Sequence, residues 1–157
     1  MIPLMALSVI EKLYLLKNKF GKIIIPDAVW TEITVEGRHK KGTDDILRAD
    51  WIKVESLQNT MLAKSLEKDL DYGESEAIAL GMEISADIIL LDDKLARTLA
   101  ANLGLNILGT LGILIWARKM GLIENLRTEL HNLLIHANFR MSQNLISKAL
   151  REVGEDA

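Results

Sequence analysis

Apolar residues near the start of the chain recur at the spacing of one helical face. Gly21 follows them, and glycine commonly ends a helix. The pattern therefore predicts a first helix that ends before Gly21, with an apolar face made of Leu4, Leu7, Ile10, Leu13 and Tyr14.

Short runs of apolar and β-branched residues predict strands. Residues 23–25 form the first run, and Pro26 then sets the first turn of a helix that carries Val29, Trp30, Glu32 and Ile33. Further strands are predicted at 51–54, 88–91 and 105–108. The run at 88–91 is continuously apolar, which is typical of a strand that is covered on both faces.

Helical patterns occupy most of the remaining chain. Asp92 is a predicted N-cap for one of these helices, because a short side-chain oxygen before an apolar repeat commonly accepts the first free N–H groups. Strands that alternate with helices favour an α/β fold in which a parallel sheet lies between helical layers. We find no repeat or linker that would divide residues 1–157, so we expect a single domain. The predicted helices cover 44–49, 59–70, 73–83, 93–102, 109–120, 124–135 and 142–152.

Composition limits the class of protein. Nearly half of the 157 residues are hydrophobic (49%), which is enough for a substantial core, and cysteine is absent. Disulfide frameworks and thiolate zinc sites are therefore excluded. The start of the chain does not resemble a signal peptide, and the apolar stretch at 111–117 is too short to span a bilayer. We expect a cytoplasmic protein with no membrane association.

The overall charge gives no sign of a nucleic-acid partner. The formal net charge is −3 and the isoelectric point is near 5.6, so any nucleic-acid binding must be local. The only dense basic run is Arg38-His39-Lys40-Lys41, which lies in a predicted loop at 37–42. This basic run could instead be an ordinary solvated loop that binds no nucleic acid.

Four carboxylates lie at two element ends that a parallel sheet would bring together. Glu74 and Glu76 open one predicted helix, and Asp92 and Asp93 follow a buried strand. Mg²⁺ and Mn²⁺ prefer such oxygen ligands, and either ion can activate water for phosphodiester hydrolysis.

Each of these acids also has an ordinary structural interpretation. Glu74 could complement the helix dipole, Asp92 could be an N-cap, and Asp93 could be a first-turn acid. Glu74 and Glu76 are two residues apart, so on a helix they cannot both point into one crevice.

Several motifs in a fixed order resemble those of PIN-domain proteins between about residues 3 and 152. They belong to the branch of predicted nucleic-acid-binding PIN proteins that carries a Gly-Glu-x-Glu-Ala-Ile helix. The motifs are Gly73-Glu74-Ser75-Glu76-Ala77-Ile78, Ala86-Asp87-Ile88-Ile89-Leu90-Leu91-Asp92-Asp93, Ala96-Arg97 and Gly109-Thr110-Leu111-Gly112.

This resemblance implies a three-layer α/β/α fold and metal-dependent cleavage of RNA, often by the toxin of a toxin-antitoxin pair. It implies Glu32, Glu76 and Asp92 as catalytic acids and ligands of Mg²⁺ or Mn²⁺, with Glu74 and Asp93 in support. Glu32 could instead belong to a solvated acidic face. Arg97 is a candidate phosphate contact, and an antitoxin protein and a homodimer are candidate partners.

The start of the chain departs from the PIN pattern. Residues 2–7 match only the end of the family's first motif, so the first strand, which is central in the sheet, and its acid are missing. Either the chain starts too late or it is a truncated, inactive copy. In the second case we expect an interaction module that binds a protein partner or nucleic acid, with apolar helices such as Leu4 to Leu16 as the contact surface.

Overall fold

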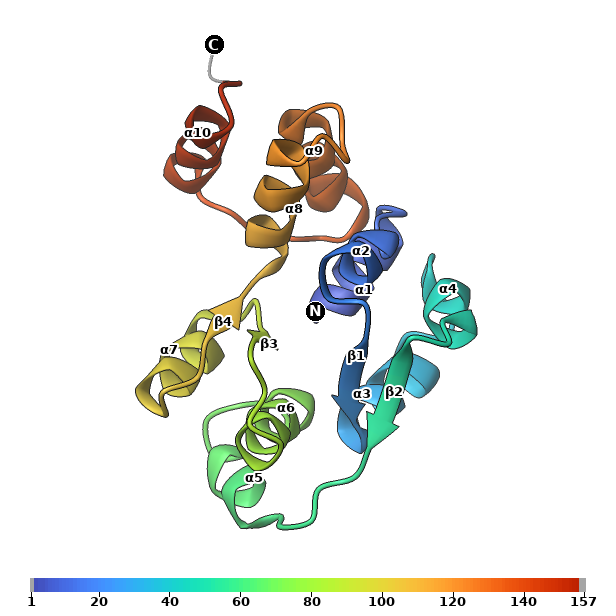
Figure 1. The fold of residues 1–157 in the computed structure, drawn as a ribbon, viewed down its shortest axis with the longest axis vertical. Helices are drawn as coiled ribbons and strands as arrows, with labels where there is room; N and C mark the ends of the chain where they lie inside the picture. Colours follow the sequence, from blue (N-terminus) through green and yellow to red (C-terminus); the bar gives the residue numbers. More distant parts are fainter. Residues whose placement is uncertain (1, 156–157) are drawn as a thin grey trace.

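The computed structural model describes residues 2–155 and contains two separate pairs of parallel strands (Figure 1). Strand β1 (Ile23–Pro26) pairs with β2 (Ile52–Glu55), and β3 (Ile89–Leu90) pairs with β4 (Ile107–Leu108). The parallel pairing confirms the α/β class. Within residues 2–155 the pairs are not joined into the single sheet that the sequence predicts.

Helices make up most of the remaining structure, and most of them overlap the ranges that the apolar periodicity predicts. The α-helices are α1 (Pro3–Val9), α2 (Tyr14–Phe20), α3 (Asp27–Thr31), α4 (Thr43–Arg48), α5 (Met61–Leu66), α6 (Tyr72–Glu83), α7 (Lys94–Asn102), α8 (Thr110–Lys119), α9 (Leu126–His136) and α10 (Gln143–Glu152). A π-helical turn, η1 (Glu32–Glu36), continues α3. Helix α5 is shorter than its predicted range of 59–70.

The predicted first helix is wrong, because the chain forms two short helices instead. Glu11 has a φ of 62°, a left-handed conformation that interrupts helical hydrogen bonding between α1 and α2. The turn lets both helices pack against α8. Every residue of α1 is buried, and Leu15 and Leu16 of α2 are fully enclosed. Leu4, Leu7, Ile10 and Leu13 of the predicted apolar face therefore belong to the core, whereas Tyr14 is exposed.

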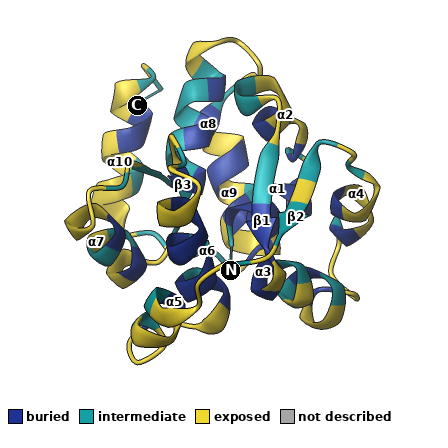
Figure 2. Cartoon of the chain, turned by 60° about the horizontal axis from the view of Figure 1, so that its bottom comes forward, coloured by how far each residue is buried: buried dark blue, intermediate teal, exposed yellow. Residues whose placement is uncertain are grey.

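The core has two parts (Figure 2). The larger cluster joins α1, α2, α8 and α9 to the inner face of β1. The smaller cluster packs α6 and α7 around β3 and includes Ile78, Ile89 and Leu91. The β1–β2 pair packs on the larger cluster, whereas β3 and β4 contact both clusters: Ile89 belongs to the smaller one, and Leu90 and Leu108 pack against the larger one.

Candidate acidic site

Glu76 joins two helices from a nearly buried position. Its side chain lies on α6, only 8% of the residue is exposed, and its Oε1 accepts the N–H of Ala28 at 3.0 Å. That N–H belongs to the first turn of α3, where Pro26 at the N-cap has no side-chain acceptor to offer. The charge of Glu76 is also the largest cause that raises the pKa of the exposed Tyr72.

Glu32 opens the π-helical turn and faces the start of α6. A β-carbon at Gly73 would collide with Glu32 Oε1, so glycine is the residue that allows this close approach. Burial, followed by the charges of Asp71 and Glu36, raises the pKa of Glu32 to about 7.

Glu74 takes part in the cap of α6. Asp71 Oδ1 accepts the N–H of Glu74 at 2.8 Å, and Glu74 Oε1 accepts the N–H of Asp71 at 3.3 Å, which forms a capping box. Burial, followed by the charges of Asp71 and Asp93, raises the pKa of Glu74 to about 7. The structural interpretation of Glu74 is thus correct, but this carboxylate also repels its acidic neighbours.

Asp71 and Tyr72 are residues that the sequence analysis missed. Asp71 is the N-cap of α6, and its charge raises the pKa of both Glu32 and Glu74. The spacing Asp71-x-x-Glu74 is a recognisable capping-box pattern, so this signal was present in the sequence. Tyr72 had no comparable signal, because its place beside Glu76 depends on the turn that opens α6.

Asp92 lies just beyond β3 and binds the start of α8. Its Oδ1 accepts the backbone N–H of Thr110 at 2.7 Å, and its Oδ2 accepts the Thr110 hydroxyl at 2.6 Å. Burial raises the pKa of Asp92, although the two hydrogen bonds from Thr110 act in the opposite direction. Arg97 Nη1 donates to the carbonyl of Leu91 at 2.9 Å, which places a guanidinium beside this carboxylate.

Asp93, not Asp92, is the N-cap of α7. Asp93 Oδ2 accepts the N–H of Ala96 at 2.9 Å, and α7 begins at Lys94. The predicted cap is therefore wrong by one residue. Asp92 is free of this role because the chain turns at Asp93, which directs the Asp92 side chain to α8.

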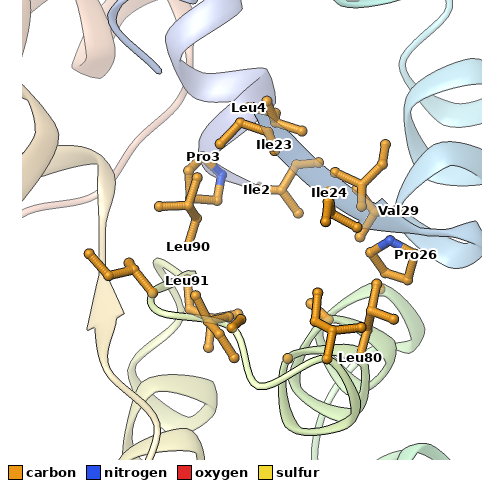
Figure 3. A pocket seen from close by; sticks show the side chains of 18 of the residues that line it. Ile2, Pro3, Leu4, Ile23, Ile24, Pro26, Val29, Leu80, Leu90 and Leu91 are labelled. Carbon is orange, nitrogen blue, oxygen red and sulfur yellow. The ribbon is translucent and has the colours of Figure 1, made fainter. Parts of the chain in front are cut away.

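Glu74 and Asp92 border the same apolar groove, which has a volume of about 430 Å³ and which we call the central groove (Figure 3). Its walls include all of β1, residues 88–92, and the side of α6 that carries Ala77 and Leu80. Glu32 lies against Gly73, which also lines the groove. The acids thus form two groups, one at the start of α6 and one beyond β3.

None of the candidate acids has a lysine or arginine partner among the ion pairs of residues 2–155. Carboxylate oxygens suit a divalent metal in chemical type, although the Arg97 guanidinium lies beside Asp92. In the same residues, however, no three His, Cys, Asp or Glu side chains lie close enough to hold a metal ion. The acids therefore do not fit a complete metal centre.

The basic run lies on the loop that follows the π-helical turn. Arg38, His39, Lys40 and Lys41 are exposed, and Lys41 Nζ lies 3.5 Å from Glu11 Oε1. The charge of Lys40 lowers the pKa of Glu32 slightly, but burial has the larger effect and raises it. Positive charge therefore lies next to the acidic site.

A family model described as a PIN domain matches residues 2–155, so the chain belongs to the PIN-domain family. This match confirms the resemblance found in the sequence. Searches of curated proteins and of solved structures gave no match. PIN domains are in general nucleases that use divalent metal ions and act on nucleic acid. No helix within residues 2–155 is long and apolar enough to cross a membrane.

Proposed function

We propose that this chain is a PIN-type ribonuclease that requires Mg²⁺ or Mn²⁺. The observation that carries the proposal is a set of carboxylates whose pKa values are raised and that form none of the ion pairs of residues 2–155. Burial is the main cause for Glu32, Glu74 and Asp92. Raised pKa values in buried acids commonly mark functional sites. Membership of the PIN-domain family suggests that the reaction at this site is cleavage of nucleic acid.

The proposed roles follow the two groups of acids. Glu32, Glu76 and Asp92 act as the catalytic acids, and Glu74 and Asp93 support them. The basic loop Arg38 to Lys41 is the proposed contact for RNA phosphates, because it is exposed and lies next to Glu32. The exposed ring of Tyr72, beside Glu76, offers a surface on which an unpaired base could stack.

The proposal is tested by cleavage of a panel of single-stranded RNAs with Mg²⁺, with Mn²⁺ and with a chelator. We expect cleavage with either metal and none with the chelator. Asp92→Asn keeps an acceptor for Thr110 but removes the charge, so it should lower cleavage by about a hundredfold or more.

Asp45→Asn is the matched control, because Asp45 is exposed and its one ion pair within residues 2–155 is with Arg48 at 3.2 Å. Equal activity of Asp92→Asn and the unchanged chain would overturn the proposal. If the protein acts as a toxin, its expression should arrest growth, and a co-expressed antitoxin should relieve that arrest.

The second candidate function is a PIN-like module that binds a protein partner without cleavage. The finding in its favour is that the acids of residues 2–155 do not gather in a group of three. A chain that shows no cleavage with either metal, on any RNA of the panel, would favour this candidate.

A further inference from the structure

A second cavity lies between the basic loop and the end of α9. It has a volume of about 500 Å³, and we call it the basic crevice. None of its described lining residues belongs to a strand, and none lines the central groove. The crevice is therefore formed by helices and loops, and it does not depend on how the strands are paired. Its lining residues are Val9, Lys40, Lys41, His136, Ala137 and Asn138.

The basic loop is held in place at both of its ends. The Thr43 hydroxyl and the Lys40 N–H both donate to the carbonyl of Gly37, which closes the loop on itself. Gly42 packs so closely on Ser8 of α1 that a β-carbon at Gly42 would collide with the Ser8 backbone. The φ of Gly42 is 89°, which also favours glycine there. The lysines of the loop therefore reach the crevice from an ordered backbone, which lowers the entropic cost of binding.

The described lining carries cationic and donor side chains and no acidic one. Lys40 and Lys41 of the loop each supply an ammonium group, and no ion pair within residues 2–155 involves Lys40. Lys41 Nζ lies 3.5 Å from Glu11 Oε1, but both side chains are well exposed, so this pair is weak. The segment that ends α9 supplies the imidazole of His136 and the amide of Asn138. The crevice thus suits an anion with several acceptor oxygens.

The end of α9 opposes an anion only weakly. A helix C-terminus carries a partial negative charge of about half an elementary charge. The carbonyl of Leu133 accepts the N–H groups of both Ala137 and Phe139, which satisfies part of this helix end. Asn138 has a φ of 52°, the left-handed conformation that commonly follows a helix. The two full charges of the lysines exceed the partial charge of the helix, so the crevice attracts anions.

Lys40 links the crevice to the acidic site, because its charge acts on the pKa of Glu32. A nucleic-acid strand carries a phosphate at every nucleotide, so one strand can contact the crevice and the acids in succession. We propose that the basic crevice holds a backbone phosphate of single-stranded RNA, away from the bond that is cleaved. This inference rests on the proposed function for the choice of RNA. It adds His136 and Asn138, which no motif identified, to the residues that bind the substrate.

The test measures binding of a short, fluorescein-labelled single-stranded RNA to the full chain by fluorescence anisotropy, with a chelator present so that no RNA is cleaved. Lys40→Met should weaken binding by about fivefold, and equally for RNAs of different sequence. It should also reduce the slope of log affinity against log salt concentration by about 0.7, because one fewer phosphate is neutralised. Lys64→Met is the matched control and should change neither quantity, because Lys64 is exposed on α5 and does not line the crevice.

Two uncharged changes separate a shaped crevice from general attraction to a basic loop. His136→Ala and Asn138→Gly leave the formal net charge of −3 unchanged, because histidine is counted as neutral. Each should weaken binding by about threefold to fivefold, since a donor to the phosphate is lost. Glycine accepts the left-handed backbone of Asn138, so Asn138→Gly should keep the fold. His131→Ala is the matched control, because His131 is exposed on the same helix and does not line the crevice.

Three results would overturn the inference. The first is the absence of RNA binding by the unchanged chain. The second is binding that His136→Ala and Asn138→Gly leave unchanged, which would mean attraction to the charge of the loop without a crevice. The third is tighter binding of a labelled poly-glutamate peptide than of RNA, weakened by the same variants, which would make the occupant an acidic protein segment.

Failure here is distinct from failure of the nuclease proposal. Asp92→Asn should still bind RNA with the chelator present, because Asp92 does not line the crevice. If the chain cleaves RNA, His136→Ala should raise KM and leave kcat unchanged, since a contact remote from the reacting bond is made equally in the ground and transition states. A chain that binds RNA through the crevice and cleaves none would support the inference and contradict only the nuclease proposal.

Discussion

The acids beside the central groove differ from Glu155 at the other end of the chain. Glu155 accepts hydrogen bonds from the N–H of Leu126 at 2.6 Å, the N–H of Arg127 at 3.1 Å and Arg118 Nε at 2.9 Å. Burial acts to raise the pKa of Glu155, but these donors outweigh it and lower the pKa. Beside the groove, burial is the main influence and raises the pKa of Glu32, Glu74 and Asp92.

This difference separates an acid that stabilises the fold from one whose charge the fold disfavours. Glu155 ties the end of the chain to the start of α9, and the folded protein favours its charged form. The fold disfavours the charged forms of Glu32 and Glu74, although Glu74 also completes the capping box of α6. We propose that the charge of Glu32 serves binding or catalysis and that Glu74 combines such a role with its place in the cap.

The largest expected effect is a loss of activity on Glu32→Gln. If the nuclease proposal holds, cleavage should fall by about a hundredfold or more, because a proposed catalytic acid becomes neutral. The free energy of unfolding at pH 8 should rise, since the variant removes a charge that burial and Asp71 disfavour. Cleavage assays and urea unfolding measure the two effects. A variant that loses stability and keeps activity would place Glu32 with Glu155 as a structural acid.

Glu155→Gln should give the opposite result. The free energy of unfolding should fall by about 1–2 kcal/mol, because two backbone N–H groups and Arg118 lose a charged acceptor. Cleavage should not change, because this residue contacts α9 and not the groove. Urea unfolding at pH 7, with RNA cleavage measured on the same sample, tests both statements. Loss of cleavage without loss of stability would contradict them.

The third expected effect is a dependence of stability on pH that differs between the two regions. Glu32 and Glu74 have folded pKa values of about 7 against a usual value of 4.5. Their neutral forms therefore favour folding below about pH 4.5, and this contribution is lost as the pH rises to 7. Glu155 has a lowered pKa, so its contribution is present above its usual pKa and is lost as the pH falls.

Unfolding curves between pH 4.5 and 8 test this sign. In Glu32→Gln the loss of stability across this range should be smaller than in the unchanged chain. Between pH 6 and 8, Glu155→Gln should lose as much stability as the unchanged chain loses. A steeper loss in Glu32→Gln would mean that the cause assigned to the raised pKa is wrong.

Much of the fold could be predicted because its signals are local. Strand β3 lies within the continuous apolar run at 88–91, and β1 includes the β-branched run at 23–25. The helix that carries Glu74 and Glu76 begins within one residue of its predicted start. The break at Glu11 could not be predicted, because the apolar period continues through it. Packing of α1 and α2 on α8 depends on residues far away in the sequence.

The candidate site divides in the same way. The motifs identified Glu32, Glu76 and Asp92 as acids of interest, but the partners of these acids come from distant segments. Ala28 lies 48 residues from Glu76, and Thr110 lies 18 residues from Asp92. Which donor reaches a carboxylate, and how far water is excluded from it, depends on three-dimensional packing. Spacing along the chain does not determine either quantity.

The order of residues by itself determined the α/β class, the family and the identity of the acids, because periodicity and motif spacing are properties of neighbouring positions. Only the tertiary structure decided that the strands of residues 2–155 form two separate pairs. It also decided that hydrogen-bond donors lower the pKa of Glu155, while burial raises the pKa of Glu32 and Glu74. Edge pairing and pKa values depend on what surrounds a group in space, and distant segments supply those surroundings.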